Sequence, residues 1–275
     1  MKEYTQQELR TQEAFSKQSL VFDEEDSANP ILQWMRSVVR KSSVSVLKKG
    51  DRILELNCGT GIDSVFFAQR GFHVTATDIA PGMLEQLEKK RIALHLEDKI
   101  DTQLLSFNKL ELLQGKKFDH VFSNFGGLNC TDDLDAVIQN IKHLLNPGGS
   151  ATLVIMPPVC LWELALALKG NFKIAFRRLK KNGAVSNLEG VTFTTWYYTA
   201  AYVAKSFGKD FTVKEIKALG LFVPPPYLFN TAIKHPRFFS FVKKIEQKTA
   251  DWLCFRSTGD HFVITLQKDQ SLAMA

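Results

Sequence analysis

A glycine-containing loop preceded by an acidic residue is the part of this sequence best suited to bind a charged ligand. Residues 52–61 read RILELNCGTG, so a short apolar run leads directly to Gly59 and Gly61. The apolar run predicts a buried strand, and glycines can take backbone angles that other residues resist. Residues 62–70 then predict a helix that ends at Gly71. Such a loop brings bare backbone and the positive end of a helix up to a ligand, which favours a carboxylate or a phosphate group.

Two ligand classes use a glycine loop between a strand and a helix, namely dinucleotides and S-adenosylmethionine. The dinucleotide fingerprint needs a third glycine, three residues after the second. Counted from Gly59 and Gly61, that position holds Ser64; counted from Asn57, it holds Ile62. Neither register completes the dinucleotide fingerprint.

The stretch instead resembles motif I of the class I S-adenosylmethionine-dependent methyltransferases, in which an acidic residue precedes a G-x-G-x-G-like loop. This resemblance implies S-adenosylmethionine as the cofactor and cofactor contacts at Glu55, Asn57, Cys58, Gly59 and Gly61. Asn57 stands where the family usually has glycine. Because asparagine tolerates left-handed backbone angles best after glycine, we expect the loop to form here as well.

Further segments resemble the same family, in the expected order. Residues 73–77 predict a second strand that ends at Asp78, where a carboxylate can accept hydrogen bonds from two ribose hydroxyls. Capping of the next helix is the alternative role, because Pro81 sits where first-turn prolines belong. The resemblance favours ribose binding by Asp78, with Ile79 beside it. Enzymes that use NAD share such an acid, so Asp78 does not discriminate between the cofactors.

Two more loops complete the predicted cofactor site. A third strand, predicted at 102–107, places Ser106 and Phe107 where the family cradles adenine, often with an acidic residue that is missing here. The segment 118–129, FDHVFSNFGGLN, resembles the family's motif at the end of the fourth strand. Ligands of open α/β sheets lie outside the carboxyl ends of the strands, so this loop is expected to face the same crevice as the glycine loop. Its predicted contacts with the methionine portion of the cofactor are Ser123, Asn124 and Phe125.

The order of the predicted elements indicates the fold class. A helix at 132–145 with apolar residues at helical spacing is followed by an Asn-Pro-Gly-Gly turn and an apolar strand at 151–156. Strand and helix alternate five times, which predicts an α/β fold with a doubly wound, mostly parallel sheet. The family resemblance implies a Rossmann-like sheet of seven strands whose last strand is antiparallel. The closing strands are predicted at 211–216 and 261–266.

We expect a single methyltransferase domain over residues 1–275, because no repeat or low-complexity linker divides the chain. Its expected parts are an N-terminal helical lid (1–50), a cofactor-binding core (51–156), an inserted substrate cap (157–209) and a sheet-closing segment (210–275). The lid rests on the resemblance of residues 15–30 to a segment that folds over the cofactor in many of these enzymes; a plain packing helix is the alternative. The expected walls of the substrate pocket are Phe15, Phe22, Trp162, Trp196, Tyr197 and Tyr198.

The positive charge excess of the chain lies in its second half. Residues 1–150 carry 18 Lys and Arg against 21 Asp and Glu, whereas residues 151–275 carry 17 against 8, within a net charge of +6. A helix is predicted from Cys160 to Leu168. In its continuation, residues 169–181, basic side chains alternate with bulky apolar ones, which suits a helix on a membrane surface or over an acidic, apolar substrate. A cap helix with a solvated face is the more common structure. Peripheral contact with a membrane therefore stays an open expectation.

These features predict a methyltransferase that acts on a small, hydrophobic or lipid-like molecule by in-line methyl transfer. A nucleic-acid methyltransferase is the first alternative, suggested by the basic half, but SNFG stands where amino-directed base methylation uses an N-P-P-[FYW] loop. A nucleotide-binding protein without transferase activity, or a dehydrogenase, is the second. The scattered histidines suggest no general base, so the catalytic residue stays unknown. No metal site is expected.

The setting of the protein is predicted from its cysteines and its ends. Its four cysteines are widely spaced without a C-x-x-C pair, so we expect neither a disulfide framework nor a zinc site, and a cytoplasmic setting is the simplest expectation. Residues 1–18 lack the apolar core of a signal peptide. Prolines and a glutamate interrupt the most apolar stretch, 151–168, which argues against a membrane span. The oligomeric state is not predicted.

Overall fold

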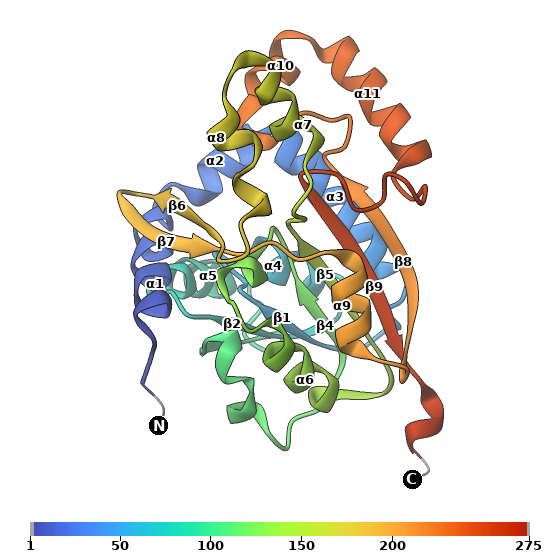
Figure 1. The fold of residues 1–275 in the computed structure, drawn as a ribbon. Coiled ribbons are helices and arrows are strands. Elements are labelled where there is room, and N and C mark those ends of the chain that lie inside the picture. Colours follow the sequence, from blue (N-terminus) through green and yellow to red (C-terminus); the bar gives the residue numbers. More distant parts are fainter. Residues whose placement is uncertain (1–2, 274–275) are drawn as a thin grey trace.

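A computed structural model of the chain describes residues 3–273 and contains a seven-stranded sheet with helices on both faces (Figure 1). The strand order is β3-β2-β1-β4-β5-β9-β8. All pairs from β3 to β5 are parallel, whereas β9 runs antiparallel to both β5 and β8. The strands are β1 (Arg52–Leu56), β2 (His73–Asp78), β3 (Ile100–Leu104), β4 (Phe118–Ser123), β5 (Leu145–Ile155), β8 (Phe211–Leu219) and β9 (His261–Lys268). The predicted doubly wound α/β sheet with an antiparallel last strand is confirmed.

Helices cover the two faces of this sheet in two separate hydrophobic cores. One core packs α6 (Leu134–Leu144) and α9 (Ala200–Phe207) on one face, with fully buried Leu54 in the middle of the sheet. The other core packs five helices on the opposite face, with Ile53 among its strand residues. These helices are α3 (Pro30–Val44), α4 (Ile62–Ala68), α5 (Pro81–Ala93), α10 (Phe229–Lys234) and α11 (Pro236–Thr249). Adjacent residues of β1 thus point into different cores, as strand geometry requires.

The N-terminal helices begin at local capping signals. In α1 (Gln6–Gln18), Thr5 and Glu8 form a capping box, in which each side chain accepts a hydrogen bond from the backbone of the other. Helix α2 (Phe22–Ala28) follows, and Asn29 then caps α3 by accepting hydrogen bonds from two of its first backbone N–H groups. The expectation of an N-terminal helical segment thus has a physical basis in caps that the sequence carries.

A second, two-stranded sheet lies beside the first. Strands β6 (Ala184–Leu188) and β7 (Val191–Thr195) form an antiparallel hairpin. Phe193 of β7 is buried beside Ala14 of α1, and the ring of Phe15 lies 5.9 Å from the Phe193 ring between centroids. The hairpin and α1 lie together at the edge of the molecule in Figure 1. An N-terminal helix and an inserted hairpin are therefore joined over one part of the sheet.

The structure differs from the sequence predictions in three places. Strand β3 ends at Leu104 rather than 107, because Ser106 caps a 3-10 helix, Phe107–Leu113. The predicted helix from 160 onward, with its basic continuation, is instead a series of short turns that includes α7 (Leu161–Leu164) and α8 (Phe172–Ala175). It breaks at Gly170, which has a left-handed φ of 78°, and at Asn171, whose side chain caps α8. Strand β6 and helices α9, α10 and α11 were not predicted.

None of the helices in the described part of the chain combines the length and apolar character that crossing a membrane requires.

Candidate cofactor site and active site

A cavity of about 360 Å³ lies at the carboxyl ends of β1, β2 and β4. The strand order changes direction between β1 and β4, and crevices at such switch points are where open α/β sheets bind ligands. The apolar lining residues are Phe15, Phe22, Ile62, Ile79, Met83, Leu105, Phe107, Phe125, Met156, Leu188 and Phe193. The charged and amide-bearing lining residues are Gln18, Arg36, Glu55, Asn57, Asp63, Asp78, Asn124 and Asn187.

Three left-handed residues shape the glycine loop at the floor of this cavity. Asn57, Gly59 and Gly61 have φ values of 46°, 57° and 77°, so the loop forms with asparagine at its first position, as expected. The Asn57 side chain accepts a hydrogen bond from Ser123 Oγ at 2.7 Å and donates one to the Asn124 carbonyl at 3.1 Å. Asn57 therefore links the loop after β1 to the loop after β4, which a glycine could not do.

Asp78 presents a buried carboxylate to the cavity from the end of β2. Its Oδ2 accepts a hydrogen bond from Gly59 N at 2.9 Å, and its Oδ1 accepts one from Ala80 N at 2.8 Å. Ala80 precedes α5, so Asp78 organises the turn and does not cap the helix itself. Burial raises the pKa of Asp78, although these backbone N–H groups act in the opposite direction. Each carboxylate oxygen keeps a lone pair for a ligand hydroxyl.

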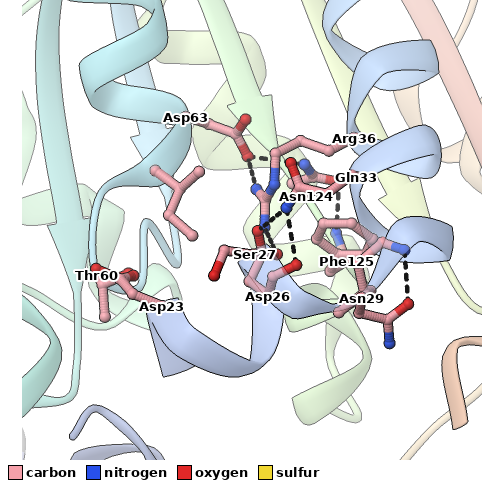
Figure 2. Close-up of polar contacts among 12 residues, drawn as sticks. Asp23, Asp26, Ser27, Asn29, Gln33, Arg36, Thr60, Asp63, Asn124 and Phe125 are labelled. Atoms are coloured by element: carbon pink, nitrogen blue, oxygen red, sulfur yellow. Dashed lines mark hydrogen bonds and ion pairs between the residues drawn. The ribbon is translucent and has the colours of Figure 1, made fainter. Parts of the chain in front are cut away.

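A buried ion-pair network forms one wall of the cavity, and Arg36 of α3 is at its centre (Figure 2). Its guanidinium group pairs with Asp26 of α2 at 2.5 Å and with Asp63 of α4. Asn124 also donates to Asp63, at 2.8 Å, and the Phe125 ring lies 4.7 Å from the Arg36 guanidinium carbon. The Arg36 Nε–H is buried without a hydrogen-bond partner among the described residues. The wall thus offers a cation with an unused donor.

The pKa values of two carboxyl groups in this wall are shifted in opposite directions. Burial, followed by the charge of Asp63, raises the pKa of Glu55 well above its usual range. Burial acts to raise the pKa of Asp63 as well, but Arg36 and Arg40 outweigh it, so the pKa of Asp63 is lowered. The pKa values of the two carboxyl groups are thus shifted apart, and Glu55 accepts a hydrogen bond from Ser64.

Helix α1 lies along the opposite wall and is tied to the core by three polar side chains. Gln7 donates to the carbonyls of Thr194 at 2.8 Å and Cys130 at 3.3 Å, and it accepts from Thr194 N at 3.0 Å. Glu8 accepts a hydrogen bond from Ser106 at 2.6 Å. Gln12 donates to the Ile79 carbonyl at 3.0 Å. These bonds hold Phe15 of α1 over the cavity.

The predicted site residues separate into two groups in the structure. Nine of the predicted cofactor residues line the cavity, together with Phe15 and Phe22: Glu55, Asn57, Cys58, Gly59, Asp78, Ile79, Phe107, Asn124 and Phe125. The other three lie behind its surface. Gly61 packs against Leu87, Ser106 bonds Glu8, and Ser123 bonds Asn57.

The predicted aromatic walls of the substrate pocket lie elsewhere. Trp196, Tyr197 and Tyr198 line a second cavity of about 590 Å³, beside Arg178, Lys180 and Lys181, and Trp162 lines neither cavity. The chain turns away after β7 because Trp196 N donates to the Asn129 carbonyl. Phe193 faces the first cavity in their place.

Sequence reasoning missed Arg36, Asp63, Met156 and the hairpin residues of the first cavity. A basic residue among the apolar positions of a predicted helix was the available signal for Arg36.

Three potential metal ligands also come together among the described residues, namely Cys160, Glu163 and Asp260. Arg178 pairs with both carboxylates at 2.7 Å, and Arg177 pairs with Glu163 at 2.6 Å. The negative charge of this cluster is therefore already balanced by arginine, and its role is to fasten the cap to β9.

Comparison with known proteins finds methyltransferases that match the first part of the chain. The sequence model of a family described as "Methyltransferase domain" matches residues 53–149, which run from β1 into β5. The chain is 33% identical over 115 residues to a malonyl-[acyl-carrier protein] O-methyltransferase of Serratia marcescens, an overlap of 42% of each chain. Residues 53–149 therefore match a methyltransferase domain, in line with the resemblance to the class I S-adenosylmethionine-dependent methyltransferases.

Solved methyltransferase structures share the fold over most of the chain. One from Listeria monocytogenes aligns with a TM-score of 0.61 and 15% identity, over 86% of this chain and 99% of that one. Another is the Burkholderia thailandensis 1,6-didemethyltoxoflavin-N1-methyltransferase with bound S-adenosylhomocysteine, with a TM-score of 0.58, 15% identity, and coverage of 98% and 92%. The alignment with the Serratia relative spans less than half of that protein's length.

The cofactor of this family is S-adenosylmethionine, and the residues around the cavity fit it. The buried Asp78 carboxylate suits ribose hydroxyls, and the unpartnered Nε–H of Arg36 suits the cofactor's carboxylate. Met83 and Phe107 provide apolar surface for an aromatic base. When bound, this cofactor supplies an electrophilic methyl group.

Proposed function

We propose that this protein is a methyltransferase that transfers the methyl group of S-adenosylmethionine to a small, largely apolar molecule. The observation that carries the proposal is the composition of one cavity: the glycine loop, Asp78 and the loop after β4 meet there, and most of the other lining side chains are apolar. The polar residues suit the cofactor, which leaves mainly apolar surface for the methyl acceptor.

The size of the cavity supports a small acceptor. At about 360 Å³ it lies near the lower end of the range of ligand sites, and the cofactor itself must occupy part of it. The surfaces left for the acceptor are those contributed by α1 and the β6–β7 hairpin, chiefly Phe15, Leu188 and Phe193. An acceptor that fits between them presents rings or alkyl groups to these side chains.

The protein's own contribution to the reaction is to position the two reactants and to exclude water. An in-line methyl transfer requires the acceptor atom to be held against the methyl donor, and alignment of this kind supplies much of the rate enhancement. Phe125 lines the cavity and has a left-handed φ of 48°, and the φ of its neighbour Gly126 is 69°. No side chain is assigned as a general base. His120, for example, is buried between Ser43 and Ser150, and burial lowers its pKa to about 3.

We further propose that α1 and α2 act as a lid on this site. Asp23 of α2 accepts a hydrogen bond from Thr60 in the glycine loop and pairs with Lys90 of α5. Helix α1 is held in the same way, by hydrogen bonds of Gln7, Glu8 and Gln12. Cofactor and acceptor therefore enter when these bonds open, and the closed position excludes water from the reacting atoms.

The test is a methyl-transfer assay with S-adenosylmethionine labelled at the methyl group. The acceptor panel contains hydrophobic phenols, fatty acids, amines, and single- and double-stranded oligonucleotides. We expect label in an apolar small molecule. Phe193→Ala should raise the KM for that acceptor about tenfold, because a large aromatic contact is lost, and should leave the affinity for S-adenosylhomocysteine unchanged.

Val185→Ala is the matched control, because Val185 lies on the same hairpin with an exposed side chain away from the cavity. Label transferred to the oligonucleotides and to no small molecule would contradict the proposed substrate class. Equal effects of Phe193→Ala and Val185→Ala on KM would contradict the assignment of the hairpin to the acceptor.

A further inference from the structure

The exposed apolar side chains of this protein gather on two helical segments at one end of the molecule (Figure 1). Residues 161–181 contain α7 and α8, and residues 226–256 contain α10 and α11. Of the 24 large apolar side chains that are exposed among the described residues, 13 lie on these two segments. Single exposed apolar residues are normal, whereas a gathering of this kind marks an interaction surface.

The same two segments carry the whole positive excess of the second half of the chain. Residues 161–181 contain six Lys and Arg against one acidic residue, and residues 226–256 contain six against two. The rest of residues 151–275 contains five against five. Two of the three acids, Glu163 and Glu246, are buried. The charge that these segments present to solvent is therefore almost entirely positive.

Basic and apolar side chains are interleaved within each segment. On α11, Phe238 and Phe241 are exposed whereas Phe239 and Val242 are buried, and Arg237, Lys244 and Lys248 lie on the side of Phe241 at helical spacing. On α8, the exposed rings of Phe172 and Phe176 stack with their centroids 6.4 Å apart. The most exposed tips are Leu168 at 91% and Leu253 at 78%.

The first segment is fastened to the stretch that joins the second segment to β9. The backbone of Leu161, at the start of α7, donates to the Thr258 carbonyl just beyond the second segment. Arg178, at the end of the first segment, is buried and donates to both the carbonyl and the carboxylate of Asp260, at 2.7 Å each. The two segments therefore form one preformed surface, and binding does not have to order it.

We propose that this basic apolar surface, residues 161–181 and 226–256, docks onto a membrane that contains anionic lipids. Protruding apolar tips bury into the boundary between headgroups and acyl chains, while Lys and Arg reach the lipid phosphates. Trp252, exposed beside Leu253, has the amphipathic ring that favours this boundary. A nucleic acid would use the positive charge but would leave most of the 13 apolar side chains in water.

Membrane docking goes beyond the proposed methyl transfer, and vesicle binding can be measured independently of that activity. The experiment is co-sedimentation of the full chain with vesicles of phosphatidylcholine alone and with 30% phosphatidylglycerol, where about a third of the headgroups are anionic. We expect binding to the anionic vesicles that is at least about tenfold stronger than to the neutral ones and that weakens as salt is raised.

Two pairs of double variants locate the surface. Leu168→Ser with Leu253→Ser should reduce binding to anionic vesicles about tenfold, because both tips lose their apolar contact. Leu104→Ser with Leu112→Ser is the matched control, since both leucines are exposed but lie outside the two segments, and it should bind like the wild type. Lys173→Glu with Lys244→Glu should also reduce binding, whereas Lys205→Glu with Lys209→Glu should not.

Three results would overturn the proposal. The first is the absence of binding to anionic vesicles while S-adenosylhomocysteine still binds the same preparation. The second is equal loss of binding in the two leucine pairs. The third is retention on heparin or polyglutamate without vesicle binding, which would assign the surface to a nucleic acid or an acidic protein.

Discussion

The bonds of Gln7 make the lid testable, because this one side chain carries three of the contacts between α1 and the core. Two of its hydrogen bonds, to the backbone N–H and carbonyl of Thr194, have lengths of 3.0 and 2.8 Å, and the third, to the Cys130 carbonyl, is longer at 3.3 Å. At about 1 kcal/mol for each good bond, Gln7→Ala should weaken closure by about 2 kcal/mol. This corresponds to about a thirtyfold larger open population.

Hydrogen exchange measures this population directly. Amides of residues 6–18 exchange when α1 opens, so their protection factors should fall about thirtyfold in Gln7→Ala. The matched control is Gln6→Ala, which removes the same type of side chain from the preceding, exposed position. Its protection factors should equal those of the wild type. Unchanged protection in Gln7→Ala, or an equal fall in both variants, would refute the assignment of α1 as a lid held by Gln7.

Three further predictions concern the scaffold of the site, each measured by chemical denaturation. Gly61→Ala should lower the free energy of unfolding by about 2–5 kcal/mol, because a Cβ would lie 2.1 Å from Leu87 Cδ1 and φ is 77°. In a Leu87→Ala background, only the backbone strain of about 1–2 kcal/mol should remain. Equal costs in both backgrounds would contradict the clash with Leu87. Arg36→Leu should cost about 3–5 kcal/mol, because buried Asp26 loses its cation and buried Asp63 keeps only Arg40, and a cost below about 1 kcal/mol would contradict that pairing. Burial raises the pKa of Glu246 from 4.5 to about 6, so the folded state binds the proton more tightly and the free energy of unfolding should fall by about 2 kcal/mol as pH rises through this window. Glu246→Gln should abolish that slope, and an unchanged slope would show that another group causes it.

The parts of the fold that local sequence determines were predictable. Apolar runs beside glycines and prolines located the central strands, and the Asn-Pro-Gly-Gly sequence located the end of α6, although β5 already begins before it, at Leu145. The left-handed angle at Asn57 followed from the intrinsic tolerance of asparagine. In each case the physical cause lies within a few residues of its effect, so a single sequence is sufficient to infer it.

The parts that depend on distant partners were not predictable. Arg36 reaches Asp26 and Asp63, and Asn124 reaches Asp63 as well, so that the network joins four separate segments, and none of these pairings has a spacing signal. The cap was predicted as one helix because its apolar pattern continues, but Gly170 and the pairing of Arg178 with Asp260 broke it into short turns. Tertiary contacts override local propensity at such positions.

A distant partner also explains why residues 196–198 do not line the substrate pocket that was predicted for them. Its residue types suit a ligand pocket, but Asn129 binds the backbone of Trp196 and so directs the chain into the second cavity. The wall of the first cavity is supplied instead by Phe193, a few residues earlier on β7. Residue type indicated an aromatic wall, whereas the long-range bond decided which residue forms it.

The most direct test of the account is isothermal titration with S-adenosylmethionine, S-adenosylhomocysteine and NAD. We expect saturable binding of S-adenosylmethionine and of S-adenosylhomocysteine, and no binding of NAD. Asp78→Ala should weaken binding at least about tenfold, because a buried acceptor for hydroxyl groups is lost. Asp98→Ala, at an exposed aspartate outside the cavity, should bind like the wild type. Binding of NAD alone, or equal affinities for Asp78→Ala and Asp98→Ala, would contradict the account.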